Sequence, residues 1–291
     1  MFKNIKLLSP TMQLLFLFGV IVFGFFQYMF LQGIIVISWI PGIEEMSDEE
    51  VMNRVMGSNS GIAQTLLILQ QVCFFLFPAL FMNYLLRENG KGIFYWDKRL
   101  QPFIVPLTLM LVAVFSIPFL YFVNIQVIEL FPNSEYFVSM DEERTKVIEQ
   151  ATSNDSSFLF LLNIIGIAIL PAIGEEMIFR GFLIRNFYQN SNNIYFAVIG
   201  SSVLFALIHF QPLKILPMLA LGLLLGLIYV YTRNLWVSIA GHFLNNILSL
   251  ISTKYPILNL SENIYISSAA SLLLILGIVY YLKGIRKIQM E

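Results

Sequence analysis

Long apolar stretches recur along the whole chain and are separated by short polar segments. A helix that crosses a bilayer needs about 20 consecutive apolar residues. Windows of this kind with little or no charge lie at about residues 11–40, 60–86, 102–124, 157–177, 194–210, 214–232, 235–252 and 265–282. The pattern predicts an all-α polytopic membrane protein with about eight transmembrane helices. No separate soluble segment interrupts it, so residues 1–291 are expected to form a single integral membrane domain.

The composition supports a membrane protein and excludes several other classes. Hydrophobic residues make up 58% of the 291 residues and charged residues 12%, against roughly 25% charged in ordinary soluble domains. A net charge of −1 leaves no basic surface for nucleic-acid phosphates. The lipid bilayer is therefore the expected environment, and nucleic acid is not an expected partner. A single cysteine, Cys73, excludes a disulfide framework and a thiolate metal cluster.

The basic residues predict how the helices are oriented. Lysine and arginine near helix ends favour the cytoplasmic side of a membrane. With the N-terminus inside, all but five of the 17 basic residues fall in the cytoplasm, Arg180 and Arg185 among them. The five exceptions are Arg54, Arg144, Lys146, Lys214 and Lys254. The sequence thus predicts cytoplasmic termini, and the compact chain without a transit peptide favours a prokaryotic plasma membrane.

The two long loops on the predicted outer side, about 41–59 and 125–156, are acidic and carry helix-start signatures. In each, a serine is followed three residues later by a glutamate: Ser47 by Glu50, and Ser139 by Glu142. Such a pair can satisfy the free amide groups at the start of a helix. Short amphipathic surface helices that begin at these serines are expected.

A few ionisable residues lie inside the predicted spans, where burying them is costly, and this makes them candidates for function. Both histidines of the chain are among them. The fourth window ends with Glu175, Glu176 and Arg180, and the fifth ends at His209. The seventh contains His242 and Asn246.

Helical spacing predicts how these side chains face one another. Glu176 and Arg180 are four residues apart and are expected to form an ion pair. Glu175 is turned about 100° away and stays free. Glu175 and His209 lie equally far along the chain from the polar turn at 190–193, so they are expected to be level with each other on the two antiparallel helices. The hairpin formed by these helices is expected to project into the cytoplasm. A free carboxylate, two imidazoles and an amide would form an acid–base and hydrogen-bonding cluster.

Three motifs in these windows resemble those of the CPBP family of intramembrane endopeptidases, which includes type II CAAX prenyl endopeptidases and bacterial Abi proteins. The motifs are Glu-Glu-x-x-x-Arg, Phe-x-x-x-His and His-x-x-x-Asn. They are matched by Glu175, Glu176 and Arg180, by Phe205 and His209, and by His242 and Asn246. The resemblance covers about residues 165–255 and points to a catalytic helical core at 157–252.

The resemblance implies hydrolysis of a peptide bond within the membrane. With the orientation predicted above, the substrate is expected to be a peptide or membrane-associated protein that is cut near the cytoplasmic face. The resemblance assigns the activation of water to Glu175 and His209. The pattern of residues adds hydrogen bonds from His242 and Asn246 to the oxyanion of the tetrahedral intermediate. Glu176 and Arg180 would support the helix that carries Glu175, with a secondary role for Arg180 in holding a substrate carboxylate.

The metal requirement and the class of function stay open at this point. Glu175, His209 and His242 could supply three ligands to zinc with an open fourth position. Glu175 would then be a ligand and Glu176 the base. The family is described both as metalloproteases and as metal-free glutamate proteases, and no His-Glu-x-x-His helix occurs here. Two other functions fit the sequence: a non-enzymatic bacteriocin-immunity or scaffolding factor, and a proton-coupled transporter.

Overall fold

The computed structural model describes residues 8–57, 61–87, 103–152, 156–255 and 263–290, and these ranges fold into helices and turns without a β-strand. The predicted all-α fold is confirmed. The helical segments are α1 (Pro10–Trp39), η2 (Ile43–Glu45), α2 (Asp48–Met56), α3 (Ile62–Gln71), η3 (Val72–Leu76), α4 (Phe77–Leu86), α5 (Ile104–Ile128), α6 (Ser134–Thr152), α7 (Ser157–Asn163), η4 (Ile164–Ile169), α8 (Leu170–Glu176), η5 (Met177–Ile184), α9 (Arg185–Ser191), α10 (Ile194–Leu207), η6 (Pro212–Lys214), α11 (Ile215–Thr232), α12 (Leu235–Lys254) and α13 (Ile264–Met290).

Within the described ranges, seven helices are long and apolar enough to cross a membrane. Three of them are continuous helices built from consecutive segments: α3 to α4, α7 to α9, and η6 with α11. The predicted span at about 194–210 is α10, a helix of 14 residues, shorter than the roughly 20 residues that cross a bilayer. The prediction of about eight spans is thus corrected to seven spanning-length helices and one shorter apolar helix.

The fourth spanning helix, Ser157–Ser191, has 35 residues and continues well past the predicted end at 177. The charges of Glu175, Glu176 and Arg180 do not end it, because all three side chains are buried within the bundle. Glu175 consequently lies near the middle of this helix. The wide π-helical turns of η4 and η5 flank α8, and such turns occur frequently at functional sites.

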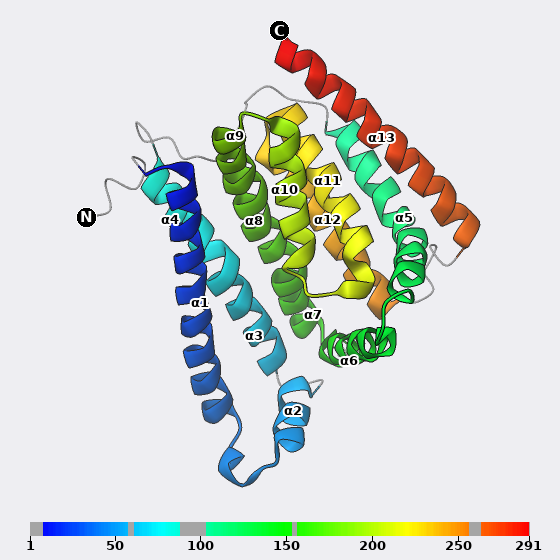
Figure 1. Ribbon diagram of the computed structural model, residues 1–291. Helices are drawn as coiled ribbons and strands as arrows, with labels where there is room; N and C mark the ends of the chain where they lie inside the picture. Colours follow the sequence, from blue (N-terminus) through cyan, green and yellow to red (C-terminus); the bar gives the residue numbers. More distant parts are fainter. Residues whose placement is uncertain (1–7, 58–60, 88–102, 153–155, 256–262, 291) are drawn as a thin grey trace.

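The helices that carry the candidate residues occupy the centre of the bundle (Figure 1). The helices α1, α3 and α4 pack on one side of α8, α10, α11 and α12, and α5 with α13 packs on the other. Buried apolar side chains such as Ala172 and Leu224 fill the contacts between them. Gly174 lets η3 approach closely, since a Cβ at this position would lie 2.8 Å from Cβ of Phe75. This packing fixes the backbone next to Glu175.

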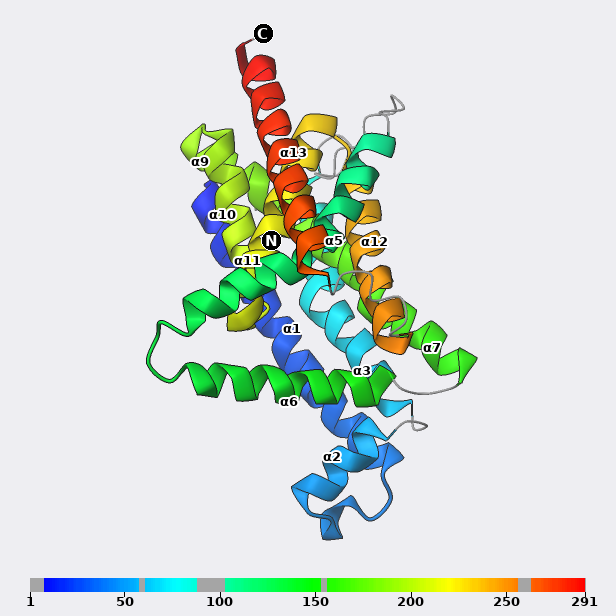
Figure 2. The same ribbon diagram turned by 90° about the vertical axis from the view of Figure 1, so that its right-hand side faces the viewer.

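Both predicted surface helices exist, but one begins earlier than expected. Ser47 and Glu50 form the predicted capping box at the start of α2, and the hydrogen bonds from Ser47 lower the pKa of the Glu50 carboxyl. In contrast, α6 begins at Ser134. The predicted start at Ser139 is wrong, because its hydroxyl donates to the carbonyl of Tyr136 (2.9 Å) within the helix. Figure 2 shows α6 running across the ends of the spanning helices.

Candidate active site

Three central helical segments bring the two histidines to one carboxylate. Glu175 lies in α8, His242 lies in α12, and His209 follows the last residue of α10. Oε2 of Glu175 is 3.9 Å from Nε2 of His209 and 4.0 Å from Nε2 of His242. Side chains far apart in the sequence thus form a compact acid–base cluster.

The Glu175 carboxylate is both buried and incompletely paired. The residue is 4% exposed, and its Oε2 is a buried atom without a hydrogen-bond partner. Burying an unpaired polar atom costs free energy. A carboxylate held in this state at such a cost is a candidate for direct participation in chemistry.

Glu176 has a different environment from its neighbour. Its Oε1 accepts hydrogen bonds from Nη1 of Arg180 (2.7 Å) and from Nδ1 of His242 (2.9 Å). The predicted ion pair is therefore present. Arg180 also donates from Nη2 to the carbonyl of Gly222 in α11 (3.1 Å). Its guanidinium lies 4.7 Å from the centre of the Phe205 ring.

The same contacts favour a supporting role for Arg180. The residue is 1% exposed, and its hydrogen bonds go to Glu176 and Gly222. A side chain enclosed in this way is poorly placed to hold a substrate carboxylate. The hydrogen bond from Arg180 to the Gly222 carbonyl instead ties the helix that carries Glu175 to α11.

Hydrogen bonds at Nδ1 orient both imidazoles. Nδ1 of His242 donates to Glu176, and Nδ1 of His209 donates to the carbonyl of Phe205 (2.7 Å). Each Nε2 is thereby directed toward Glu175, because a hydrogen bond at one ring nitrogen fixes the role of the other. The Phe205 ring packs against both imidazoles, with centroid distances of 4.9 and 5.7 Å.

Asn246 lies one turn beyond His242 on α12. Its Oδ1 accepts a hydrogen bond from Nδ2 of Asn245 (3.0 Å). This bond leaves the Nδ2 group of Asn246 as the donor for other partners. Sequence reasoning missed the contribution of Asn245, although a second asparagine inside an apolar span was a usable signal.

The donor atoms of Glu175, His209 and His242 are of types that bind zinc, but their placement does not form a ligand set. Neighbouring ligands of a tetrahedral zinc, each about 2.0–2.1 Å from the ion, lie roughly 3.3 Å apart. The distances from Glu175 to the two histidines exceed this value. In the described part of the chain, no group of three or more His, Cys, Asp or Glu side chains is arranged to hold a metal ion. The mechanism proposed below therefore uses protein groups.

A second set of residues, absent from the predictions, holds the segment around His209. Arg144 of α6 donates from Nη1 to the carbonyl of His209 (3.0 Å). With the Gln211 carboxamide turned so that its oxygen faces Arg144, that oxygen accepts two further hydrogen bonds, at 3.0 and 3.1 Å. The sequence offered a weak signal for Arg144, as one of the few basic residues on the predicted outer side.

The contact with α6 also changes where the site lies along the helices. The start of α1 and the end of α13 are on the side of the molecule opposite α2 and α6 (Figure 1). The loop after His209 contacts α6. The His209 end of the site therefore lies toward the side of the molecule opposite the termini. Arg180, counted as a cytoplasmic residue in the sequence, is buried inside the bundle and does not bear on orientation.

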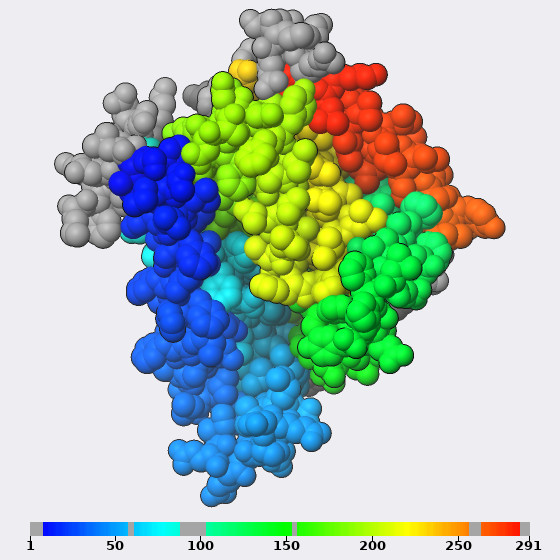
Figure 3. Space-filling view, in the orientation of Figure 1, coloured from blue at the N-terminus to red at the C-terminus, as the bar shows by residue number. Residues whose placement is uncertain are grey.

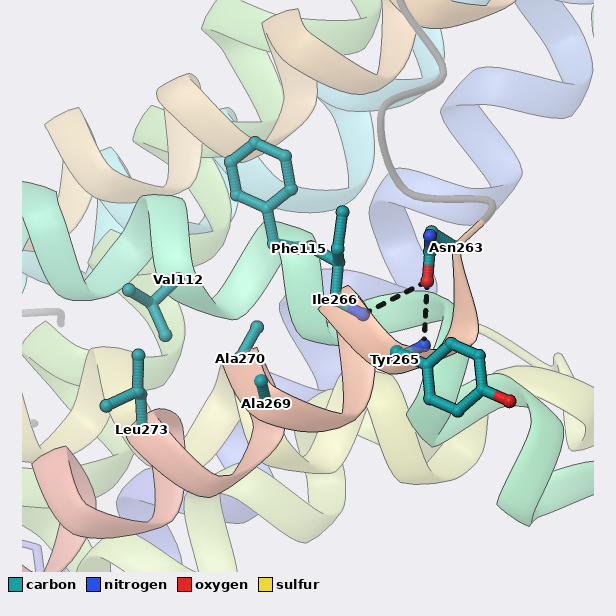
Figure 4. Close-up of a pocket in the computed structure, with 8 residues that line it drawn as sticks. All are labelled: Val112, Phe115, Asn263, Tyr265, Ile266, Ala269, Ala270 and Leu273. Carbon is teal, nitrogen blue, oxygen red and sulfur yellow. Dashed lines mark hydrogen bonds between the residues drawn. The ribbon is translucent and has the colours of Figure 1, made fainter.

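A separate pocket of about 500 Å³ lies between α5 and α13 (Figure 4). Its lining is almost wholly apolar. The carboxamide oxygen of Asn263 is used there to cap α13 by accepting from the amides of Tyr265 and Ile266. This pocket offers no acid–base chemistry. The residues that line it are Val112, Phe115, Asn263, Tyr265, Ile266, Ala269, Ala270 and Leu273.

The fold and the site together define a polytopic, all-helical membrane protein with a buried acid–base cluster. A model of the Rce1-like family, described as type II CAAX prenyl endopeptidase Rce1-like, matches residues 157–248. This segment contains all the residues of the cluster. The same segment carries the three motifs, and the resemblance to the CPBP family drawn from them is confirmed.

Two relatives from Bacillus subtilis (strain 168) match part of the chain. The chain is 33% identical over 101 residues to the protein named "Putative membrane peptidase YdiL". It is 34% identical over 86 residues to "Uncharacterized protein YpbD". These alignments cover 35% and 28% of this chain, and the chain spans 41% of the length of each relative. No solved structure matches the chain.

Proposed function

We propose that this protein is an intramembrane endopeptidase that hydrolyses a peptide bond in a peptide or membrane-associated protein. One observation carries the proposal: the buried, unpaired Oε2 of Glu175 faces Nε2 of both His209 and His242. The membrane-protease family model that matches residues 157–248 supports the same reaction class.

Glu175 and His209 activate the attacking water in this mechanism. The 3.9 Å between Oε2 of Glu175 and Nε2 of His209 is too long for a direct hydrogen bond. It is short enough for one water molecule to contact both atoms. As the water oxygen bonds to the carbonyl carbon, Glu175 takes one of its protons. The carbonyl electron pair moves to the oxygen and forms a tetrahedral oxyanion.

His242 and Asn246 stabilise that oxyanion. In this step His242 acts with both ring nitrogens protonated: Nδ1 donates to Glu176 and Nε2 donates to the oxyanion. Asn246 donates from Nδ2, since its oxygen is engaged by Asn245. When the intermediate collapses, the C–N bond breaks and the protonated Glu175 returns its proton to the amine nitrogen. Hydrolysis thus yields one carboxylic acid and one amine, and the Glu175 carboxylate is regenerated.

The assignment is tested with purified protein reconstituted in liposomes and incubated with a peptide mixture, with cleavage followed by mass spectrometry. We expect His209→Ala to lower the rate of cleavage by about 10²-fold or more, the range typical for loss of an acid–base group. Size-exclusion chromatography and circular dichroism of the variant serve as the folding control. Equal cleavage by the wild type and the folded variant would contradict the mechanism. Absence of cleavage by both the wild type and the variant would favour the non-enzymatic alternative.

We place the protein in a prokaryotic plasma membrane with both termini in the cytoplasm, which puts α6 and the His209 end of the site toward the outside. The excess of lysine and arginine on the predicted cytoplasmic side supports this orientation. In a Cys73→Ser background, Lys146→Cys on the exposed face of α6 should react with a membrane-impermeant thiol reagent added to intact cells. Labelling only after the cells are opened would invert the orientation.

A further inference from the structure

His209 is held outside any regular helix. It lies in the segment that we call the His209 loop, residues 208–214, between the end of α10 and the start of α11. The next residue, Phe210, has a φ of 50°, in the left-handed region that non-glycine residues seldom adopt. Beyond α10, a turn hydrogen bond from the amide of Phe210 to the carbonyl of Leu207 (3.1 Å) spans His209. Contacts from other segments add to this local bond.

Side chains of α5 and α6 supply those contacts. Arg144 donates to the carbonyl of His209 itself and faces the carboxamide of Gln211. One helical turn earlier on α6, Oδ1 of Asp141 pairs with Nζ of Lys214 (3.1 Å) at the far end of the loop. Two residues of one helix thus bind both ends of the His209 loop. Figure 3 shows the green surface of this region directly against the yellow surface of the loop and α11.

The helix α6 is itself anchored in the bundle at its other end. Nε2 of Gln64 in α3 donates to the carbonyl of Ala151 (2.6 Å), and Gln64 is 3% exposed. On the opposite side of the loop, Asn124 of α5 bonds both the carbonyl of Pro212 (2.8 Å) and the amide of Leu216 (2.9 Å). The loop is therefore held between two fixed supports, and Arg144 is the support nearest the imidazole.

We propose that Arg144 is a positioning residue for His209, and that α6 is thereby a working part of the active site instead of a peripheral surface helix. This inference rests on the proposed function, in which His209 contacts the attacking water. Displacing a catalytic group by about 1 Å can cost a large factor in rate. In this role Arg144 contacts the His209 loop and not the substrate, so its loss is expected to act on turnover more than on affinity.

The first test compares Arg144→Gln with Lys146→Gln, which removes the same charge from the same helix. We expect Arg144→Gln to lower kcat about 10-fold with KM within about two-fold, and Lys146→Gln to leave both unchanged. Arg144→Lys keeps a cationic donor to the His209 carbonyl and should recover part of the rate. Equal kcat for Arg144→Gln and Lys146→Gln, or a change confined to KM, would overturn the proposal.

A second measurement does not depend on catalysis. The chain has two histidines, so isotope labelling of histidine gives two sets of imidazole NMR signals, which His209→Ala and His242→Ala assign. We expect Arg144→Gln to shift or broaden the His209 signals and to leave those of His242 in place. Unchanged His209 signals would overturn the proposal. Altered His209 signals in a protein that cleaves no peptide would support the positioning role and remove the proposed function.

Exchanging the charges of Asp141 and Lys214 provides a test that does not depend on the folding of the Arg144 variant. Asp141→Lys should disturb the His209 signals through repulsion of Lys214, and the double variant Asp141→Lys with Lys214→Asp should restore them. Restoration identifies contact between α6 and the loop as the cause. Failure of the double variant to restore the signals in a folded protein would count against the role of α6.

Discussion

Replacing Glu175 with glutamine should abolish peptide hydrolysis and leave the protein at least as stable as the wild type. The amide cannot accept a proton from water, so we expect kcat to fall by about 10³-fold or more. The fold loses little, because Oε2 of Glu175 has no hydrogen-bond partner. Removing a buried carboxylate that stands beside another, Glu176, also relieves an electrostatic cost. The variant should thus lose its activity while its stability stays unchanged or increases.

The measurement pairs the rate of cleavage in liposomes with thermal unfolding in detergent. Glu49→Gln, on the exposed surface of α2, is the matched control and should change neither quantity. A Glu175→Gln variant that is folded and retains more than a tenth of the wild-type rate would exclude Glu175 as the general base. A variant that loses stability together with activity would instead point to a structural role.

The sequence was informative where the relevant geometry is local. Spacing of four residues correctly paired Glu176 with Arg180, and the 100° turn between adjacent helical positions correctly separated Glu175 from that pair. Residue counts along antiparallel helices correctly brought His209 level with Glu175. Each of these predictions depends on the regular rise and twist of one helix or hairpin.

Features that depend on contacts between distant segments were not predicted. The hydrogen bond from His242 to Glu176 joins residues 66 positions apart, and that from Arg144 to His209 joins residues 65 apart. Neither spacing nor hydropathy specifies such contacts. The end of the fourth span was misplaced because a charge normally ends a membrane span. Arg180 does not end it, since Glu176 one turn earlier neutralises it and α11 supplies a further hydrogen-bond acceptor.

The largest effect on stability is expected at Arg180. Arg180→Met keeps much of the side-chain volume but leaves the buried Glu176 carboxylate with His242 as its remaining partner, and it leaves the Gly222 carbonyl without its donor. Breaking a buried ion pair from one side typically costs about 3–5 kcal/mol. We expect a loss of this size in the free energy of unfolding, measured by SDS titration in mixed micelles.

The double variant Glu176→Gln with Arg180→Met separates the ion pair from simple packing. It removes both charges, so no unpaired carboxylate stays buried, and we expect it to be more stable than Arg180→Met alone. If Arg180→Met lowered the free energy of unfolding by less than about 1 kcal/mol, the loss would be typical of a solvent-exposed ion pair. This result would contradict the buried geometry. Because Glu176 also orients His242, the double variant should regain stability without regaining the wild-type rate. That outcome would separate the role of Arg180 in holding the bundle from the role of Glu176 in orienting the imidazole.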